Sequence, residues 1–271
     1  MGATRVRSAS RPRDFVAVRG RDAEDYLQRM VSNDVAALAR GEACDALLLT
    51  AKARVIAPLR VLRRTADDFL LLTEAGLGTT VRDHLVQFRF AARATIEPEE
   101  HVASLLLGEG VPRPDGAFVL PTSEYGVPGY EVLDAEPAPD TNPLDEAELE
   151  RMRIEAGTPR FGFEIDDRVL PAEAGLVERA VSLSKGCFPG QEPIARLHYR
   201  GHANRSLRAL SLSTSELPER DADVRYGDKV VGRVTSAAPA DGRVVALAYV
   251  RSEVPADAEL AVGNAVARPL H

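Results

Sequence analysis

The stretch Lys185-Gly186-Cys187-Phe188-Pro189-Gly190-Gln191-Glu192 combines residue types that can make a thiol reactive. Gly186 and Gly190 permit tight backbone turns on either side of Cys187, and Pro193 is suited to the first turn of a helix. A thiol beside a lysine and a helix N-terminus has a lowered pKa and reacts as the thiolate. The alternative is that Cys187 is a small buried apolar residue, as lone cysteines commonly are. The residues by themselves leave both interpretations open.

A row of basic residues follows this stretch. Arg196, His198, Arg200 and His202 alternate with period 2, so on a β-strand they would share one face. Such a strip could receive a polyanion, and a solvated strand face explains the same pattern equally well. A metal site built from His198, His202 and Cys187 would lack a fourth ligand and any standard spacing, so we expect no metal.

The elements that position these residues follow from hydrophobic periodicity. A helix is expected over residues 145–156, because acidic residues fill its first turn, Leu149 and Met152 share a face, and Gly157 ends it. Glu155 lies in its last turn. A helix over residues 23–31 should begin at Asp22 as its N-cap, and another should span 78–88. Strands are expected at 15–18, 47–49, 55–62, 69–72, 103–107, 117–120 and 130–133.

The remaining segments complete the expected organisation. Pro58 favours an edge or a bulge for its strand. The Pro-rich residues 135–143 mark a boundary or an excursion. After residue 204 short strands recur at 207–212, 229–235, 244–250 and 260–267, with Asp241-Gly242 as a tight hairpin turn. The mixture of hairpins and helices predicts an α+β fold, with a small β-barrel or sandwich at the C-terminal end.

Composition bounds the class of protein. The chain has 271 residues, of which 45% are hydrophobic and 28% are charged, as is usual for globular proteins. A formal charge of -7 gives no overall attraction for nucleic acid. The sequence has no apolar run of about 18 residues and no secretory signal, so we expect no membrane segment and a cytoplasmic location. Cys44, which we expect to be structural, and Cys187 form no CxxC pair, which fits a reducing compartment.

Residues 1–13 carry four arginines and no acidic residue before Asp14. We expect a disordered basic tail over this range and prefer it to a transit peptide, whose composition would be similar.

Five separated blocks resemble the superfamily of YgfZ proteins and glycine-cleavage T-proteins (aminomethyltransferases). They are Gly20-Arg21-Asp22-Ala23 with Ser32-Asn33-Asp34-Val35, Arg153-Ile154-Glu155-Ala156-Gly157 with Phe161-Gly162, Pro171 to Leu176, Lys185 to Glu192, and Gly232-Arg233-Val234-Thr235-Ser236. The Lys-Gly-Cys-Phe-x-Gly-Gln-Glu block is characteristic of the YgfZ branch, and there the cysteine is the hallmark. This resemblance favours a functional role for Cys187.

The resemblance implies a fold of two α+β lobes around a central folate-binding channel, followed by a C-terminal β-barrel. We therefore expect a folate-binding domain over residues 14–204 and a barrel domain over 205–271. One lobe should combine residues near 14–44 with 144–204, and the other should span 45–134.

The resemblance also implies tetrahydrofolate, or a one-carbon derivative, as the cofactor. Glu155 resembles the carboxylate that accepts hydrogen bonds from the pterin ring, a role that suits an acceptor-only group facing a two-donor edge. A helix-terminal surface acid is the alternative. Lys185, Gln191, Arg196 and Arg200 are the further candidates for folate binding, the arginines through the ligand's glutamate tail.

One departure separates the chain from the aminomethyltransferases. The strand that carries their acidic pair corresponds to residues 53–59 here, and Ala57 and Pro58 stand where the acids should be. Neither side chain can assist proton transfer. By resemblance we expect a folate-binding protein that supports iron–sulfur cluster assembly or repair, with assembly proteins or client enzymes as partners. The alternatives are a folate-dependent aminomethyl or methyl transferase and a folate-independent interaction module.

Overall fold

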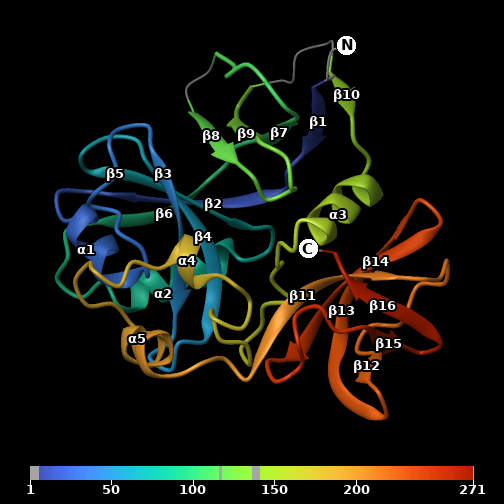
Figure 1. Ribbon diagram of the computed structural model, residues 1–271. Helices are drawn as coiled ribbons and strands as arrows, with labels where there is room; N and C mark the ends of the chain where they lie inside the picture. The colour runs from blue at the N-terminus through green and yellow to red at the C-terminus, as the bar shows by residue number, and fades with distance from the viewer. Residues whose placement is uncertain (1–5, 116–117, 136–140, 271) are drawn as a thin grey trace.

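The computed structural model describes residues 6–115, 118–135 and 141–270. These residues form two five-stranded sheets, a closed six-stranded barrel and five helices (Figure 1). The two sheets and the barrel occupy three corners of the molecule, and helix α3 runs between the second sheet and the barrel. The fold is α+β with a C-terminal β-barrel, so both of these predictions are confirmed.

The first sheet has the strand order β3-β4-β5-β2-β6. Val16 and Val18 of β2 lie in the core formed with the helices, while Phe15 faces the opposite side, as the period-2 alternation of a strand requires. The helices that cover this face are α1 (Ala23–Met30) and α2 (Gly78–Gln87). The strands are β2 (Arg13–Arg19), β3 (Ala43–Leu49), β4 (Val55–Arg63), β5 (Asp68–Glu74) and β6 (Thr95–Glu99).

The second sheet has the order β10-β1-β7-β9-β8 and packs on the other face of the first sheet. Leu62 and Leu70 of the first sheet contact Leu120 and Leu133 of the second in one buried cluster. Its strands are β1 (Arg7–Ser10), β7 (Ala103–Leu107), β8 (Phe118–Thr122), β9 (Gly129–Leu133) and β10 (Asn142–Pro143).

Two boundary predictions differ from this arrangement. Residues 7–10 form β1 and pair antiparallel with β7, so the prediction of a disordered tail is wrong for this part of residues 1–13; residues 1–5 lie outside the described chain. The strands β3, β4 and β5 share a sheet with β2, whereas the second sheet combines β1 with residues 103–143. The first lobe therefore includes residues 45–74, and α3 packs on the second sheet, so the predicted boundary at residues 44 and 45 is wrong. The predicted association of residues 14–44 with the later segment holds only for its second part, where Ser182 N donates to the Ser32 carbonyl oxygen at 3.0 Å.

Helix α3 (Glu146–Glu155) begins at a capping box, in which the Asp145 carboxylate accepts from Glu148 N at 2.8 Å and the Glu148 carboxylate accepts from Asp145 N. Met152 packs in the core of the second sheet and Ile154 packs against the barrel. Because one of these side chains packs on the second sheet and the other on the barrel, α3 fixes the second sheet relative to the barrel. The short helix α4 (Val177–Ala180) and α5 (Gln191–Arg200) follow.

The barrel closes in the order β11-β14-β13-β12-β15-β16, and β16 pairs back to β11. Its interior is filled by aliphatic side chains such as Leu210, Val234 and Val250. The strands are β11 (Arg205–Leu212), β12 (Asp223–Tyr226), β13 (Lys229–Ala240), β14 (Arg243–Arg251), β15 (Leu260–Val262) and β16 (Ala265–Pro269). In the described part of the chain, none of the helices has the length and apolar character needed to cross a membrane.

Candidate functional site

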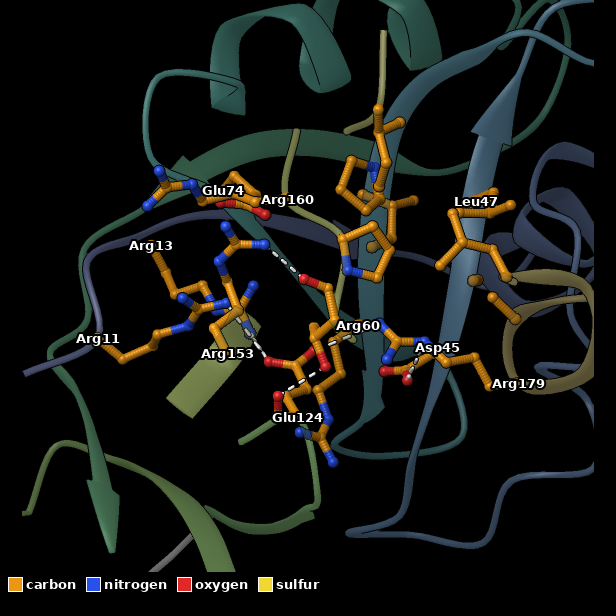
Figure 2. A pocket seen from close by; sticks show the side chains of 18 of the residues that line it. Arg11, Arg13, Asp45, Leu47, Arg60, Glu74, Glu124, Arg153, Arg160 and Arg179 are labelled. Atoms are coloured by element: carbon orange, nitrogen blue, oxygen red, sulfur yellow. Dashed lines mark hydrogen bonds and ion pairs between the residues drawn. The ribbon is translucent and has the colours of Figure 1, made fainter. Parts of the chain in front are cut away.

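A cavity lies where β2, β3 and β4 of the first sheet meet the segments around residues 124, 158–165 and 176–180 (Figure 2). We call it the inner chamber. Its volume is about 40 Å³, which is room for ordered water but not for a fused-ring ligand. Part of its wall is apolar, formed by Leu47, Pro58 and Leu176.

Arginine dominates the charged lining of the inner chamber. Three carboxylates, those of Asp45, Glu74 and Glu124, accompany the arginines. The guanidinium groups come from distant parts of the chain, namely Arg11, Arg13, Arg60, Arg153, Arg160 and Arg179. A lining of this kind offers many hydrogen-bond donors and a few acceptors, so it suits a planar ligand rich in acceptor atoms or an anion.

Two of the arginines are held by ion pairs with glutamates. Arg13 forms a bidentate pair with the buried Glu131, through Nε to Oε1 at 2.8 Å and Nη2 to Oε2 at 3.1 Å. Burial by itself would raise the pKa of Glu131, but the charge and hydrogen bonds of Arg13 and the charge of Arg60 lower it to about 2. Arg153 bonds both Glu150, at 2.7 Å, and Glu164, at 3.0 Å. These two side chains form a rigid base for the chamber.

Three other arginines hold unused donors. The Nε atoms of Arg11, Arg60 and Arg160 are buried without a hydrogen-bond partner among the described residues. A buried donor left unpaired costs about 1–3 kcal/mol, so three such donors on neighbouring arginines indicate a site that a ligand or water completes. All three residues line the inner chamber.

The carboxylates of the chamber differ in how they are held. Glu124 lies among Arg11, Arg13 and Arg179, whose charges lower its pKa against the effect of burial. Burial raises the pKa of Asp45, and Arg179 and Arg60 only partly oppose this. A carboxyl with a raised pKa in an arginine-lined cavity marks a functional site.

A larger groove adjoins the inner chamber, and we call it the outer groove. It has a volume of about 790 Å³ and runs along α3 past Ser10, Leu144 and Glu146. Five residues line both spaces: Arg11, Glu74, Tyr125, Arg153 and Arg160. The chamber and the groove are therefore separated by a shared wall in which long charged side chains predominate.

Comparison with known proteins decides the family. A scan against models of protein families finds no match. The tRNA-modifying protein YgfZ of Edwardsiella ictaluri is 31% identical over 281 residues, covering 91% of this chain and 85% of that protein. The chain belongs to the YgfZ family. The YgfZ protein of Shigella sonnei is 27% identical with 90% and 84% coverage, and an uncharacterized protein of Haemophilus influenzae is 26% identical with 84% and 82% coverage. The resemblance predicted from the sequence blocks is thus confirmed.

A solved structure shares the fold of this YgfZ family member. The glycine cleavage system aminomethyltransferase T from Bartonella henselae superimposes with a TM-score of 0.83 at 20% identity, covering 98% of this chain and 85% of that one. At this identity the likeness establishes the architecture. It confirms the predicted relationship between the YgfZ and aminomethyltransferase folds.

The YgfZ-branch signature acts first as a structural clamp. The Lys185 ammonium is buried and donates to the backbone oxygens of Gln28, Val31 (2.6 Å) and Asn33 (3.1 Å), at the C-terminal end of α1. Gly190 packs against the turn at residues 50–53. Lys185, which was predicted to bind folate, therefore donates its hydrogen bonds to the backbone and does not line the inner chamber.

The other residues of the signature lie outside the inner chamber as well. Cys187 is exposed, so the interpretation of a buried apolar residue is wrong. It precedes α5 by four residues, and Gln191 is the first residue of that helix. The predicted activation by Lys185 is not supported, because that ammonium is directed to α1. Within the described residues, no group of three or more His, Cys, Asp or Glu side chains is arranged to hold a metal ion.

The predicted basic strip is wrong in its secondary structure. Residues 191–200 form α5, where Ile194 is buried, Leu197 is half-buried, and Arg196 and Arg200 are exposed one turn apart. The segment forms a helix and not a strand because the apolar residues Ile194 and Leu197 are spaced i and i+3 and Pro193 lies in the first turn. Neither arginine lines the inner chamber.

Glu155 and the departure at Ala57-Pro58 occupy different surroundings. The Glu155 carboxylate is half-buried and accepts from Arg151 at 3.1 Å, with Arg243 of the barrel at 3.9 Å; it is not among the residues that line the chamber. Pro58 does line the chamber, whereas Ala57 is buried under the helices. β4 is an inner strand, so the predicted edge is wrong, whereas the predicted bulge is present in the ladder with β3, whose register shifts opposite Leu48 and Leu49, just before Pro58. The ladder of β4 with β5 begins at Leu59, so it needs no N–H from Pro58.

The arginines and acids of the inner chamber carry no local signal in the sequence that predicts them as a site. They lie as much as 168 positions apart, from Arg11 to Arg179, and no two of them form a local motif. One signal was available, since Pro58 lies within the stretch aligned to the acidic strand of the aminomethyltransferases and Arg60 follows that stretch directly. The other members meet only through the sheet order.

Proposed function

We propose that this protein binds tetrahydrofolate, or a one-carbon derivative of it, in the inner chamber and outer groove. The observation that carries the proposal is the donor-rich chamber of six arginines, three of them with unpaired Nε–H groups, in a chain of the YgfZ family. A pterin presents ring nitrogens and a carbonyl oxygen that such donors can satisfy. It also presents an amino group that a carboxylate can receive.

The chemistry of the lining fits a folate, but the volume of the inner chamber requires a rearrangement of side chains before a pterin ring can enter. The chamber of about 40 Å³ is too small for a pterin ring, but the outer groove of about 790 Å³ adjoins it across the shared wall. Arg11 and Arg160, both in that wall, each have an unused Nε–H, and their Nη atoms contact Glu124 at 3.4 Å and Glu150 at 3.2 Å, so a change of rotamer exchanges these ion pairs for contacts with the ligand. Their outward rotation joins the two spaces, with the pterin inside and the rest of the folate in the groove.

We further propose that the bound folate supports iron–sulfur cluster assembly or repair, with Cys187 as the thiol that contacts the partner or its cluster. The exposed position of Cys187 supports a contact with another molecule, and its placement outside the chamber separates this role from folate binding. Relatives are named tRNA-modifying proteins. With a net charge of -7, this chain suits an indirect role better, through a client enzyme that modifies tRNA.

The alternative is a folate-dependent aminomethyltransferase. The presence of Pro58 in the chamber wall argues against a transferase, because proline cannot assist proton transfer. A transferase is supported by the acids other than Glu155 that line the chamber, namely Asp45, Glu74 and Glu124. We favour the non-catalytic function for two reasons. Glu124 is held by arginines, and none of the three acids lies at positions 57 and 58, where the aminomethyltransferases carry their acidic pair.

The test is a titration of the protein with tetrahydrofolate under anaerobic conditions, followed by calorimetry, together with an assay of aminomethyl transfer. Saturable binding at micromolar to millimolar ligand without transfer is the expected result. In a strain that lacks the gene, Cys187→Ser should fail to restore iron–sulfur enzyme activity, whereas the matched Cys44→Ser should restore it. Robust transfer would establish the alternative, and absence of binding at millimolar ligand would establish a folate-independent module.

A further inference from the structure

Asp45 of β3 and Arg60 of β4 are directly opposed across the antiparallel ladder of the first sheet. Opposed residues on neighbouring strands point to the same face, with Cβ atoms about 4.5–5.5 Å apart. Both side chains line the inner chamber, and Figure 2 shows them side by side there. The pair therefore presents a carboxylate next to a guanidinium on one wall.

The carboxylate of Asp45 keeps its accepting capacity. Its ion pair in the described structure is with Arg179 Nε at 3.7 Å, which is too long for a hydrogen bond. Strand β3 holds the residue in place, since the Asp45 carbonyl oxygen accepts from the Asn33 side-chain amide at 2.7 Å.

Arg60 likewise keeps one donor. Its Nη2 donates to the Pro121 carbonyl oxygen and its Nη1 lies 3.5 Å from Glu131 Oε2, which fixes the far end of the guanidinium. The Nε–H is buried and has no partner among the described residues. An anchored guanidinium with one unused inner donor is preorganised for a single acceptor atom.

The next opposed pair on the same face is Leu47 of β3 and Pro58 of β4. Both line the chamber, so an apolar surface lies beside the polar pair. A flat ring can rest on this surface while its polar edge meets Asp45 and Arg60.

We propose that Asp45 and Arg60 together recognise the 2-amino-4-oxopyrimidine edge of the pterin. The Asp45 carboxylate accepts hydrogen bonds from the 2-amino group and from N3–H, and the Arg60 Nε–H donates to the 4-oxo oxygen. These three ligand groups are consecutive on one ring edge, as the two side chains are adjacent on one wall. The inference rests on the proposed folate binding and gives to Asp45 the role that sequence resemblance assigned to Glu155.

The other acids of the chamber are less suited to this role. Glu124 already lies within 4 Å of Arg11, Arg13 and Arg179. Glu74 lines the outer groove as well as the chamber, so it lies at the shared wall. Asp45 lines the inner chamber and not the groove.

The experiment measures the affinity of 5-formyltetrahydrofolate, a stable tetrahydrofolate, for the wild type, Asp45→Asn and Glu155→Gln. Asparagine keeps the size of the side chain and replaces one acceptor by a donor. Loss of charge-assisted bonds predicts a Kd about 10- to 100-fold higher for Asp45→Asn. Glu155→Gln should stay within about twofold of the wild type, because a group outside the chamber makes no such bond. Arg60→Lys, which keeps the charge but removes the Nε–H, should weaken binding about 5- to 20-fold.

A second ligand pair tests the contact itself. The wild type should bind 6-methyltetrahydropterin more tightly than the analogue that lacks the 2-amino group, and in Asp45→Asn this preference should disappear. Circular dichroism and melting of each variant establish that it is folded. Wild-type affinity in Asp45→Asn, or a large loss in Glu155→Gln alone, would overturn the inference and leave folate binding intact. Absence of binding by the wild type overturns both.

Discussion

Glu131 of β9 and Arg13 of β2 form a bidentate ion pair that ties the second sheet to the first beneath the inner chamber. Arg60 of β4 approaches the same carboxylate at 3.5 Å. Glu131 is only 1% exposed, so the pair is shielded from water. The site and the junction between the sheets thus share the same charged side chains.

Replacing Glu131 by glutamine should destabilise the protein strongly. The substitution removes the carboxylate that Arg13 binds directly and leaves only Glu124, at 3.9 Å, as a nearby counter-charge. Breaking a buried pair in this way costs about 3–5 kcal/mol. The measurement is the free energy of unfolding in urea. Glu97→Gln, at an exposed position of β6, is the matched control and should change stability by less than about 0.5 kcal/mol. A similar small effect in both variants would show that the junction does not depend on this pair.

The same pair predicts how stability depends on acid. The pKa of Glu131 is lowered to about 2 in the folded protein, against about 4.3 in an unfolded chain. Its stabilisation is therefore fully present above about pH 4.3 and is lost as the pH falls toward 2. The stability gap between the wild type and Glu131→Gln should be constant from pH 5 to 8 and should narrow below about pH 4.3. A gap that narrows already near pH 6 would point to another group.

Gly190 is required by the backbone of the YgfZ signature. It has a φ of +82°, and a Cβ atom there would lie 2.8 Å from the Thr50 carbonyl oxygen and 2.9 Å from Ala53 Cα. Gly190→Ala should cost more than about 2 kcal/mol, since both the left-handed conformation and the close approach are penalised. Gly186→Ala is the matched control, because a Cβ at Gly186 meets nothing within 4 Å. Equal melting temperatures for the two variants would contradict this account.

The elements that sequence analysis predicted well are those with local signals. The helix over residues 145–156 is predicted by the acidic residues of its first turn and by Gly157, which ends it. The hairpin of the barrel is predicted by the turn residues Asp241-Gly242. β1 was missed because its four residues are stabilised by pairing with β7, about 95 positions away. The sequence of residues 7–10 has no periodicity that would predict this pairing with β7. The short α5 was misjudged because its charged residues repeat with period 2 while its buried residues are few.

The site was harder to predict than the fold for a related reason. Asp45 and Arg60 become neighbours only when β3 and β4 pair in one particular register. A shift by one residue would turn one of them to the other face. The motif around Cys187 was predicted from its resemblance to the YgfZ branch, and in the structure Gly190 and Lys185 of that motif make backbone contacts.

The two cysteines should react at very different rates. Cys187 is exposed, whereas Cys44 is half-buried and burial raises the pKa of its thiol to about 12. In the native protein a thiol reagent such as Ellman's reagent should modify one cysteine rapidly, and Cys187→Ser should abolish that fast phase. Cys44 should react only after unfolding in denaturant. Two fast phases in the native protein would contradict the raised pKa of Cys44.

The raised pKa of Asp45 predicts opposite effects on stability and on binding. Burial disfavours the ionised carboxylate, so the folded state binds its proton more tightly than the unfolded chain does. At pH 7 this group therefore reduces stability, and Asp45→Asn should melt at a higher temperature than the wild type. The difference should shrink as the pH falls through the pKa of Asp45, because the protonated wild-type side chain is neutral too.

Binding should follow the same titration with the opposite sign. The proposed pterin contact needs the ionised carboxylate, so wild-type affinity for 5-formyltetrahydrofolate should fall with acid from a pH above the usual aspartate range, and Asp45→Asn should lack this decline. Asp83→Asn on α2, at an exposed position, should leave both the melting temperature and the pH profile unchanged. Lower stability of Asp45→Asn at pH 7 would show that the carboxylate serves the fold instead of the ligand. The expected combination, a more stable variant that binds less, is typical of residues retained for function.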